Sequence, residues 1–467
     1  MTGAFPWDED SAKRLLTAAL NAAGVAKGVE AEATLGGGSL ALTRFANNRI
    51  HQNVQEEWPR LSLRVILRGK GGVRVGHASS GRIDRKGLKR LAADARALAK
   101  LATPAPTGSV PKVAPPPKGF AEVDAWDPQA ADAGPALRAD RASRIVLPAR
   151  AKGLTAAGVF AVHQMSLGDY SHPGMFAMAN TAGLFAYHRR TRVESGCTIM
   201  SDDSSGWARY DDWSYERVDP AALAASAIEK AERSRKPKAA DPGEATVVLE
   251  PEAVASLLWF LMPSFSAQAV QEERSVLTGK LGRKLFPEFI KLEDDCFHPL
   301  HQGRPFDGEG VPTRKVTLID DGVAANLVYS RREAAAAPQR LGAQPTGHGP
   351  QQPSTEGSMP RFPVLAGGVE TLQDLIGDAG DGVLVTRLWY NRMVDPRRVR
   401  VTGMTRDGTF RIRNGKIAEG VRNLRYNIAV PDLLNNVLAA STPVRAGGMV
   451  VPALLVRAFP FTSSTRF

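Results

Sequence analysis

The segment from Asp294 to His301 gathers residue types that bind divalent metals. Asp294 and Asp295 precede Cys296, and His298 and His301 follow it with the spacing C-x-H-x-x-H. Thiolate, imidazole and carboxylate groups all suit such ions. One hypothesis is therefore an enzyme with an unorthodox metal site here. The alternative is a surface turn, because a proline interrupts the segment and no second Cys/His cluster supplies the remaining ligands of a tetrahedral site.

A second pair of acidic residues follows a few positions later in the sequence. Asp307 and Glu309 are separated by one glycine in P-F-D-G-E-G-V-P. They are candidates for contact with a peptide substrate, through its amine or its backbone. The alternative is a turn in which the two carboxylates accept backbone N–H groups.

The sequence lacks the motifs of two other common kinds of site, the serine nucleophile and the phosphate-binding loop. Ser204 and Ser205 are not part of the G-x-S-x-G turn of serine hydrolases. The glycines of G-K-L-G and G-K-G-G do not match a phosphate-binding loop. Neither a serine nucleophile nor a nucleotide site is predicted.

The charge balance raises a different possibility. Lys and Arg number 60 against 48 Asp and Glu, a net charge of +12. A basic protein can bind nucleic acid, but the excess is spread along the chain, with no zinc-finger, homeodomain or aromatic RNA-binding signature. We keep a basic nucleic-acid-binding protein as an alternative and do not favour it.

The composition and the N-terminal residues also indicate the cellular compartment of the protein. The 467 residues, 43% of them hydrophobic, contain two cysteines, Cys197 and Cys296, too few for a disulfide framework. The start M-T-G-A-F-P-W-D-E-D is acidic where a signal peptide is basic and then apolar. The uncharged stretch 253–271 is interrupted by Pro263 and polar residues. We expect a soluble, cytoplasmic chain without membrane contact.

These residues need a scaffold to position them. In the first half of the chain, the sequence predicts two helices on either side of a meander of strands. Residues 11–24 and 85–102 repeat apolar residues at helical spacing, with Asp10 or Ser11 as the cap of the first helix. Residues 30–77 alternate around glycine-rich turns, which predicts antiparallel strands. The proline-rich segment 103–119 is predicted to be an extended linker.

The second half carries the candidate chemistry on a β-rich framework. An apolar helix is predicted over 253–262, strands dominate the last hundred residues, and P-D-L-L-N-N-V-L predicts one short helix. Residues 342–360 are poor in apolar residues and predict a flexible loop. We therefore expect an α+β fold with two domains: residues 1–240 with the meander and helices, and a β-rich domain of residues 241–467.

Five motifs in order give the chain a family resemblance. They are T-R-F-A-N-N-R-I-H-Q-N (43–53), S-S-G-W-A (204–208), S-V-L-T-G-K-L-G with L-E-D-D (275–295), P-F-D-G-E-G-V-P-T-R-K-V-T-L-I-D-D-G-V (305–323) and R-N-G-K-I-A-E-G-V-R-N-L-R-Y-N (413–427). Their order resembles the TldD/PmbA family over nearly the whole chain. The resemblance implies a cytoplasmic two-domain protein of a metalloprotease family, acting as a dimer on short or unfolded peptides. The family's older description as a modulator of DNA gyrase rests on genetics and implies no contact with DNA.

This chain differs from the family pattern at the positions of the metal ligands. The resemblance implies that TldD-type members carry H-E-x-x-x-H on a helix before S-x-x-x-G-K-x-G, with a final cysteine near the C-terminus. Here the first stretch corresponds to L-W-F-L-M-P (258–263), and no histidine lies between His188 and His298. The C-terminal region reads V-R-A-G-G-M-V-V-P (444–452), and no cysteine follows Cys296.

This pattern resembles the PmbA branch, also called TldE. The resemblance then implies a subunit with no catalytic residue, zinc or other cofactor of its own, which contributes one wall of a peptide chamber. It implies a heterodimer with a TldD-type catalytic subunit, or a homodimer where that partner is missing.

Overall fold

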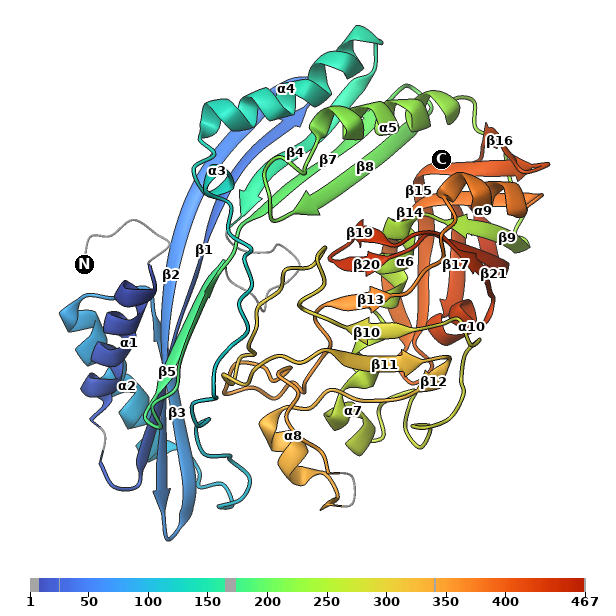
Figure 1. Ribbon diagram of the computed structural model, residues 1–467. Coiled ribbons are helices and arrows are strands. Elements are labelled where there is room, and N and C mark those ends of the chain that lie inside the picture. The colour runs from blue at the N-terminus through green and yellow to red at the C-terminus, as the bar shows by residue number, and fades with distance from the viewer. Residues whose placement is uncertain (1–7, 25, 164–173, 340–341, 466–467) are drawn as a thin grey trace.

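A computed structural model describes residues 8–24, 26–163, 174–339 and 342–465. Figure 1 shows a long, curved antiparallel sheet from the first half of the chain beside a more compact, β-rich second half. The α+β fold class is confirmed.

The first half is built on an eight-stranded sheet. Its strand order is β3-β2-β1-β4-β7-β8, and β5 pairs with β1 and with β6. The strands are β1 (Val29–Ala46), β2 (Arg49–Gly69), β3 (Gly72–Ser80), β4 (Thr155–His163), β5 (Met175–Asn180), β6 (Phe185–Arg189), β7 (Arg192–Met200) and β8 (Ser205–Asp212). The predicted meander corresponds to β1, β2 and β3. Asn47 and Asn48, both at positive φ, form the tight turn between the first two.

Helices cover this sheet at its two ends (Figure 1). They are α1 (Glu9–Ala23), α2 (Arg85–Leu101), α3 (Pro128–Ala131), α4 (Pro135–Ala151) and α5 (Pro220–Arg233). The cap predicted at Asp10 or Ser11 is wrong by a few residues, because the Asp8 carboxylate accepts the Ser11 N–H and starts α1. The helix predicted over 85–102 is confirmed as α2.

The second half contains two further sheets. The six-stranded sheet has the order β12-β11-β10-β13-β20-β19. In the seven-stranded sheet the order is β14-β9-β21-β17-β15-β16, with β18 on β21, and β14 also pairs with β15. The helical segments of the second half are α6 (Pro251–Leu258), the 3₁₀ turn η1 (Met262–Phe265), α7 (Ala267–Gln271), α8 (Arg331–Ala336), α9 (Leu372–Asp378) and α10 (Val430–Asn435).

The strands of these two sheets span the rest of the chain. They are β9 (Gly243–Leu249), β10 (Leu292–Asp294), β11 (Val316–Asp320), β12 (Val323–Ala324), β13 (Pro363–Leu365), β14 (Gly382–Asp395), β15 (Arg400–Arg413), β16 (Lys416–Gly420), β17 (Leu424–Ala429), β18 (Val437–Ala440), β19 (Val444–Ala446), β20 (Met449–Val451) and β21 (Leu454–Ser464). The short helix predicted at P-D-L-L-N-N-V-L is confirmed as α10. A domain boundary between residues 240 and 241 stays a proposal, supported by strands up to Asp212 belonging to one sheet and those from Gly243 to the others.

Residues 342–360 form a loop, as predicted, but its backbone is not free at the surface. Its backbone is held by buried carboxylates from distant parts of the chain: Asp307 accepts the Gly349 N–H at 2.7 Å, and Glu333 accepts the Ser358 N–H at 2.8 Å. His348 and Ser358 are each only 1% exposed. The sequence suggests flexibility because carboxylates remote in sequence, rather than the loop's own apolar residues, order it.

No helix among the residues that the structure describes has both the length and the apolar character to span a membrane.

Candidate functional site

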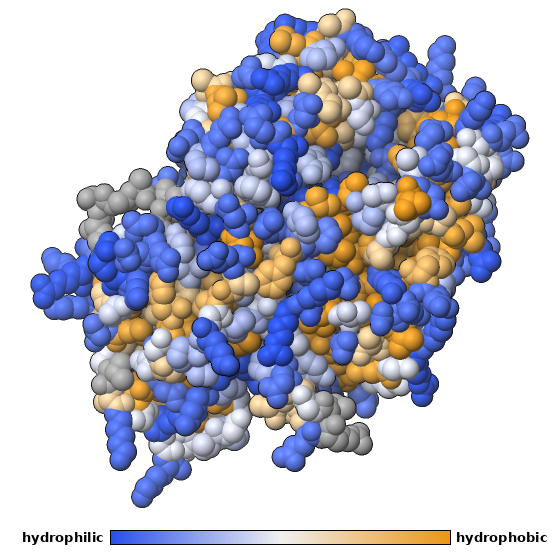
Figure 2. Space-filling model, in the orientation of Figure 1, coloured by the Kyte–Doolittle hydropathy of each residue, from blue (hydrophilic) through white to orange (hydrophobic). Residues whose placement is uncertain are grey.

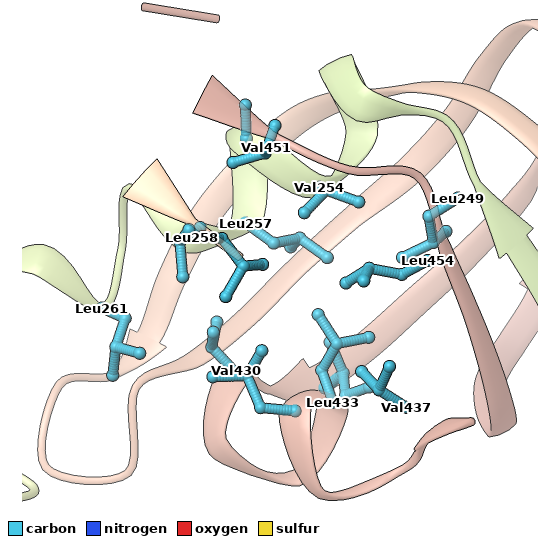
Figure 3. Close-up of a cluster of buried hydrophobic side chains, with 14 of the residues drawn as sticks. Leu249, Val254, Leu257, Leu258, Leu261, Val430, Leu433, Val437, Val451 and Leu454 are labelled. Atoms are coloured by element: carbon cyan, nitrogen blue, oxygen red, sulfur yellow. The ribbon is translucent and has the colours of Figure 1, made fainter. Parts of the chain in front are cut away.

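The stretch 258–263 lies at the end of α6 and is packed with aliphatic side chains. The helix predicted over 253–262 stops at Leu258, where the chain turns through Trp259 into η1. Leu258 is 2% exposed, and Leu261 and Met262 are fully buried. Figure 3 shows the leucines of α6 facing Val430 and Leu433 of α10. The segment closes a hydrophobic core.

The stretch 444–452 lies directly against that turn. The indole N–H of Trp259 donates to the Gly447 carbonyl at 2.8 Å, and the Glu252 carboxylate accepts the Gly447 N–H at 3.0 Å. A Cβ on Gly447 would lie 2.8 Å from that of Ala255, so the close approach needs glycine. The two stretches that the resemblance connects with metal binding therefore meet in space.

The side chains at this meeting point do not fit a zinc ion. Zinc in proteins takes nitrogen, thiolate or carboxylate donors. The leucine, phenylalanine and methionine side chains of residues 258–263 offer none of these, and the indole of Trp259 can only donate its proton. The Glu252 carboxylate is a single possible donor, and it already accepts the Gly447 N–H. Among the described residues, no group of three or more His, Cys, Asp and Glu is arranged to hold a metal. No reaction step is assigned to a metal at residues 258–263 and 444–452.

Next to residues 444–452, a buried ionic network joins the first half of the chain to the second. Arg445 of β19 donates through Nη2 to Asp211 Oδ2 of β8 at 2.8 Å and through Nε to the Asp211 carbonyl at 3.0 Å. Arg192 Nε lies 3.1 Å from the same carboxylate. Burial alone would raise the pKa of Asp211, but the two guanidinium charges outweigh it and hold the pKa well below its ordinary value. Asp211 therefore stays ionised in the interface.

The residues of the alternative metal hypothesis are not assembled into a site. Cys296 is fully buried, and burial, with the charges of Asp294 and Asp295, raises the pKa of its thiol. His301 Nε2 bonds to the Pro363 carbonyl at 3.0 Å, and burial followed by the Arg445 charge lowers its pKa to about 3. His298 Nδ1 accepts the Leu300 N–H at 3.2 Å. This alternative is not favoured.

Asp294 orders the nearby loop. Its Oδ1 bonds to His348 Nε2 at 2.8 Å, and its Oδ2 accepts the backbone N–H groups of Arg361 and Phe362 at 2.6 and 2.7 Å. Burial opposes ionisation of Asp294, but these contacts keep its pKa below the ordinary value. The carboxylate therefore fixes the backbone at Arg361.

The candidate peptide contacts Asp307 and Glu309 lie in a buried turn, 1% and 5% exposed. Asp307 accepts the N–H groups of Glu309, Val311 and Gly349 at 2.7 to 2.9 Å, and Glu309 accepts that of Arg331 at 2.8 Å. This is the bonding pattern of the turn interpretation. Their contact with a peptide stays a prediction.

Burial sets the protonation of this pair. It raises the pKa of Asp307 despite the three N–H groups. Burial and the neighbouring charge of Asp307 raise the pKa of Glu309 to about 7. Glu309 therefore changes charge near neutral pH.

A cavity of about 750 Å³ opens between η1 and the loop 350–361. Pro263, the last residue of L-W-F-L-M-P, lines one wall, and Gly308, between the two acids, lines another. A Cβ on Gly308 would lie 2.2 Å from the Gln351 nitrogen, so only glycine fits there. Three arginines, Arg274, Arg304 and Arg361, also line the cavity.

Comparison with known proteins decides the family. Residues 242–463 match the PmbA/TldA metallopeptidase C-terminal domain, and residues 127–235 match the PmbA/TldA metallopeptidase central domain. The chain belongs to the PmbA/TldD metallopeptidase family.

Individual relatives agree with this placement. A metalloprotease of Methanothermobacter thermautotrophicus is 27% identical over 58% of this chain and 61% of its own length. The metalloprotease PmbA of Escherichia coli O157:H7 is 21% identical over 61% of this chain and 63% of its own. The matched stretches thus span less than two thirds of either relative. The crystal structure of TldE from Thermococcus kodakarensis shares the fold, with a TM-score of 0.81 at 20% identity over 96% of this chain and 99% of that one.

Within this PmbA/TldD protein, sequence reasoning missed the arginines and His348. Arg304 and Arg361 are 57 residues apart and belong to different loops, and no spacing rule connects them. The glycines on either side of His348 suggested flexibility, whereas they allow the backbone to approach Thr313 and Glu309 closely. The one sequence signal that could have indicated these arginines is the concentration of Gly and Pro near Arg304 and near Arg361.

Proposed function

We propose that this chain is the non-catalytic, PmbA-like (TldE-like) subunit of a cytoplasmic peptidase complex. A TldD-type partner would supply the zinc site, and the complex would degrade or process short or unfolded peptides. This chain would contribute one wall of the peptide-binding chamber.

The observation that carries the proposal is the chemistry of residues 258–263. Leu258, Leu261 and Met262 are buried in a hydrophobic core and cannot donate to zinc. The rest of the family fold is kept around them, including the approach of the C-terminal stretch at Gly447. A retained scaffold without donors suits a subunit that binds and positions substrate while another chain performs the hydrolysis.

Exposed hydrophobic side chains support a partner. Figure 2 shows hydrophobic residues gathered mainly over the C-terminal half of the face in view. In the second half of the chain, Val369, Leu438 and Val444 are 91%, 50% and 44% exposed. Surfaces of this kind are commonly buried in protein interfaces.

The test is to compare the chain alone with the complex. Purified alone, it should contain no stoichiometric zinc by elemental analysis and should not cleave an unfolded peptide. Mixed with a TldD-type chain that carries H-E-x-x-x-H, it should co-elute and increase cleavage, which a chelator abolishes. A partner whose first histidine is replaced by alanine is the matched control. Zinc-dependent cleavage by this chain alone would contradict the proposal.

A further inference from the structure

The 750 Å³ cavity differs from an ordinary surface hollow in its charge. Its lining includes Arg274, Arg304 and Arg361, while Glu356 is the one acidic residue among the described lining residues. Small-ligand sites occupy about 300 to 1,000 Å³, so the cavity has room for several atoms beyond a single ion.

Arg304 is held rigidly at this cavity. The residue is 2% exposed, and its guanidinium carbon lies 4.2 Å from the centre of the Phe176 ring and 5.4 Å from that of Phe306. Its Nε donates to the Phe306 carbonyl at 2.8 Å. The contact with the Phe176 ring and the Nε hydrogen bond together fix the guanidinium, which makes recognition of a planar anion specific.

Arg361 is oriented through a separate set of contacts. Asp294 accepts its backbone N–H at 2.6 Å, and its Nη2 donates to the Gly349 carbonyl at 3.2 Å. Arg274 lies at the rim, 61% exposed, and its Nε donates to Glu272 at 2.8 Å. The two inner arginines therefore dominate the cavity, and Arg274 adds positive charge at its edge.

We infer that this cavity binds a carboxylate group of the peptide substrate, with Arg304 and Arg361 as the recognising residues. The inference rests on the proposed function and names the substrate chemistry: peptides with an anionic group. Arginine's fork of N–H groups matches a carboxylate in shape and charge. The carboxylate can be the C-terminus of the peptide or an Asp or Glu side chain.

The rest of the peptide has a neighbouring space to occupy. A second cavity of about 350 Å³ shares Phe176 and Gln351 with the first and extends to Trp58 and His77 on the long sheet. Its lining includes Trp58 and the backbone of Gly36 and Gly37, which carry no side chain to fill the space. A peptide anchored at the arginines would direct its remaining side chains toward this aromatic end.

The experiment is calorimetric titration of the full chain with one unfolded peptide in four forms. The forms combine a free or amidated C-terminus with an internal Glu or Gln. Losing the recognised carboxylate should weaken binding about tenfold or more, since a hydrogen bond to a charged group is among the stronger ones. A loss on amidation identifies the C-terminus, and a loss on Glu-to-Gln exchange identifies the side chain. Equal affinity for all four forms would overturn the inference.

Variants of the chain locate the effect. Arg361→Gln should remove the preference for the carboxylate form, while Arg397→Gln, in the turn after β14, should keep it. Arg304→Lys keeps the charge but not the fork and should reduce the preference. Because Arg304 is buried, its variant is used only if thermal unfolding shows a folded chain, and Arg361→Gln decides the question alone. An unchanged preference in Arg361→Gln would reject this cavity as the site.

The two proposals fail in different ways. If partner-dependent cleavage is observed but binding ignores the carboxylate, the cavity assignment is wrong and the subunit role stands. If the chain binds carboxylate peptides through Arg361 but no TldD-type chain gains activity from it, the subunit role is wrong and the cavity assignment stands.

Discussion

The indole N–H of Trp259 donates to the carbonyl of Gly447 across 188 residues of sequence, at 2.8 Å. This contact joins the end of α6 to the turn between β19 and β20, the two places where the family resemblance puts metal ligands. The Trp259 hydrogen bond, the bond from the Gly447 N–H to the Glu252 carboxylate and hydrophobic packing therefore hold these two places together in this chain.

Removing that hydrogen bond should cost stability without unfolding the chain. Trp259→Phe keeps an aromatic ring but leaves the Gly447 carbonyl without its donor, so we expect a loss of about 1 to 2 kcal/mol in the free energy of unfolding. Urea denaturation measures it. Tyr390→Phe, at a residue 62% exposed, is the control and should change it by less than about 0.5 kcal/mol. Equal effects of the two changes would show that the contact is not structural.

The aliphatic packing at the same place predicts a larger effect. Leu258→Ala removes a side chain that is 2% exposed and leaves a cavity in the core, which should cost about 2 to 5 kcal/mol. Leu281→Ala makes the same chemical change at a residue 39% exposed and should cost much less. Thermal melts of both variants decide the matter. A small loss for Leu258→Ala would mean that the segment is not closed by packing.

The contact between Asp211 and Arg445 should hold the two halves together. Replacing Arg445 by Met leaves Arg192 as the remaining ion-pair contact of the buried Asp211 carboxylate. Breaking a buried pair costs about 3 to 5 kcal/mol when the remaining charge is uncompensated, so we expect a loss of about 2 to 3 kcal/mol here. The exposed pair of Arg413 and Glu419 is the matched comparison, and Arg413→Met should cost no more than about 1 kcal/mol. Chemical denaturation of each variant provides the measurement. If Arg445→Met were as mild as Arg413→Met, the buried pair would have no structural role.

Local patterns predicted the elements well and the site only in part. Alternation and the Asn47-Asn48 turn predicted the meander, and apolar spacing predicted α2, because those signals are contained within one element. That residues 258–263 differ from H-E-x-x-x-H could be recognised in the sequence, because this family motif occupies a few adjacent positions. The cavity could not be, since Arg304 and Arg361 are brought to it by bonds from Asp294 and stacking on Phe176, which are remote in sequence.

Both thiols should be inert in the folded chain. Cys197 and Cys296 are 1% and 0% exposed, and burial raises the pKa of Cys197 to about 12 and also raises that of Cys296. A metal ligand or nucleophile must be a thiolate. A disulfide reagent at pH 8 should therefore label no thiol in the native state and two in guanidinium chloride. Rapid native labelling of Cys296 would revive the metal hypothesis around His298 and His301.

Glu309 should make stability fall as the pH rises toward neutrality. Its pKa is about 7 in the folded chain against 4.5 for the free side chain, because burial and the charge of Asp307 favour the protonated form. Between these values the folded state binds more protons than the unfolded state, so the free energy of unfolding decreases with increasing pH, by up to about 3 kcal/mol. His301 acts in the opposite sense: its lowered folded pKa makes stability increase with pH between about 3 and 6.5. The two slopes partly cancel in wild type.

The difference between wild type and Glu309→Gln measures the contribution of Glu309 together with its effect on the titration of Asp307. Glutamine can still accept the Arg331 N–H but cannot ionise, so the variant should gain stability relative to wild type from pH 5 to pH 8, with the steepest change below pH 7. Urea denaturation at several pH values measures the difference, and Glu122→Gln, at an exposed residue, should give a flat one. A flat difference for Glu309→Gln as well would show that Glu309 titrates as it does in water. The buried turn with Asp307 would then not control its charge.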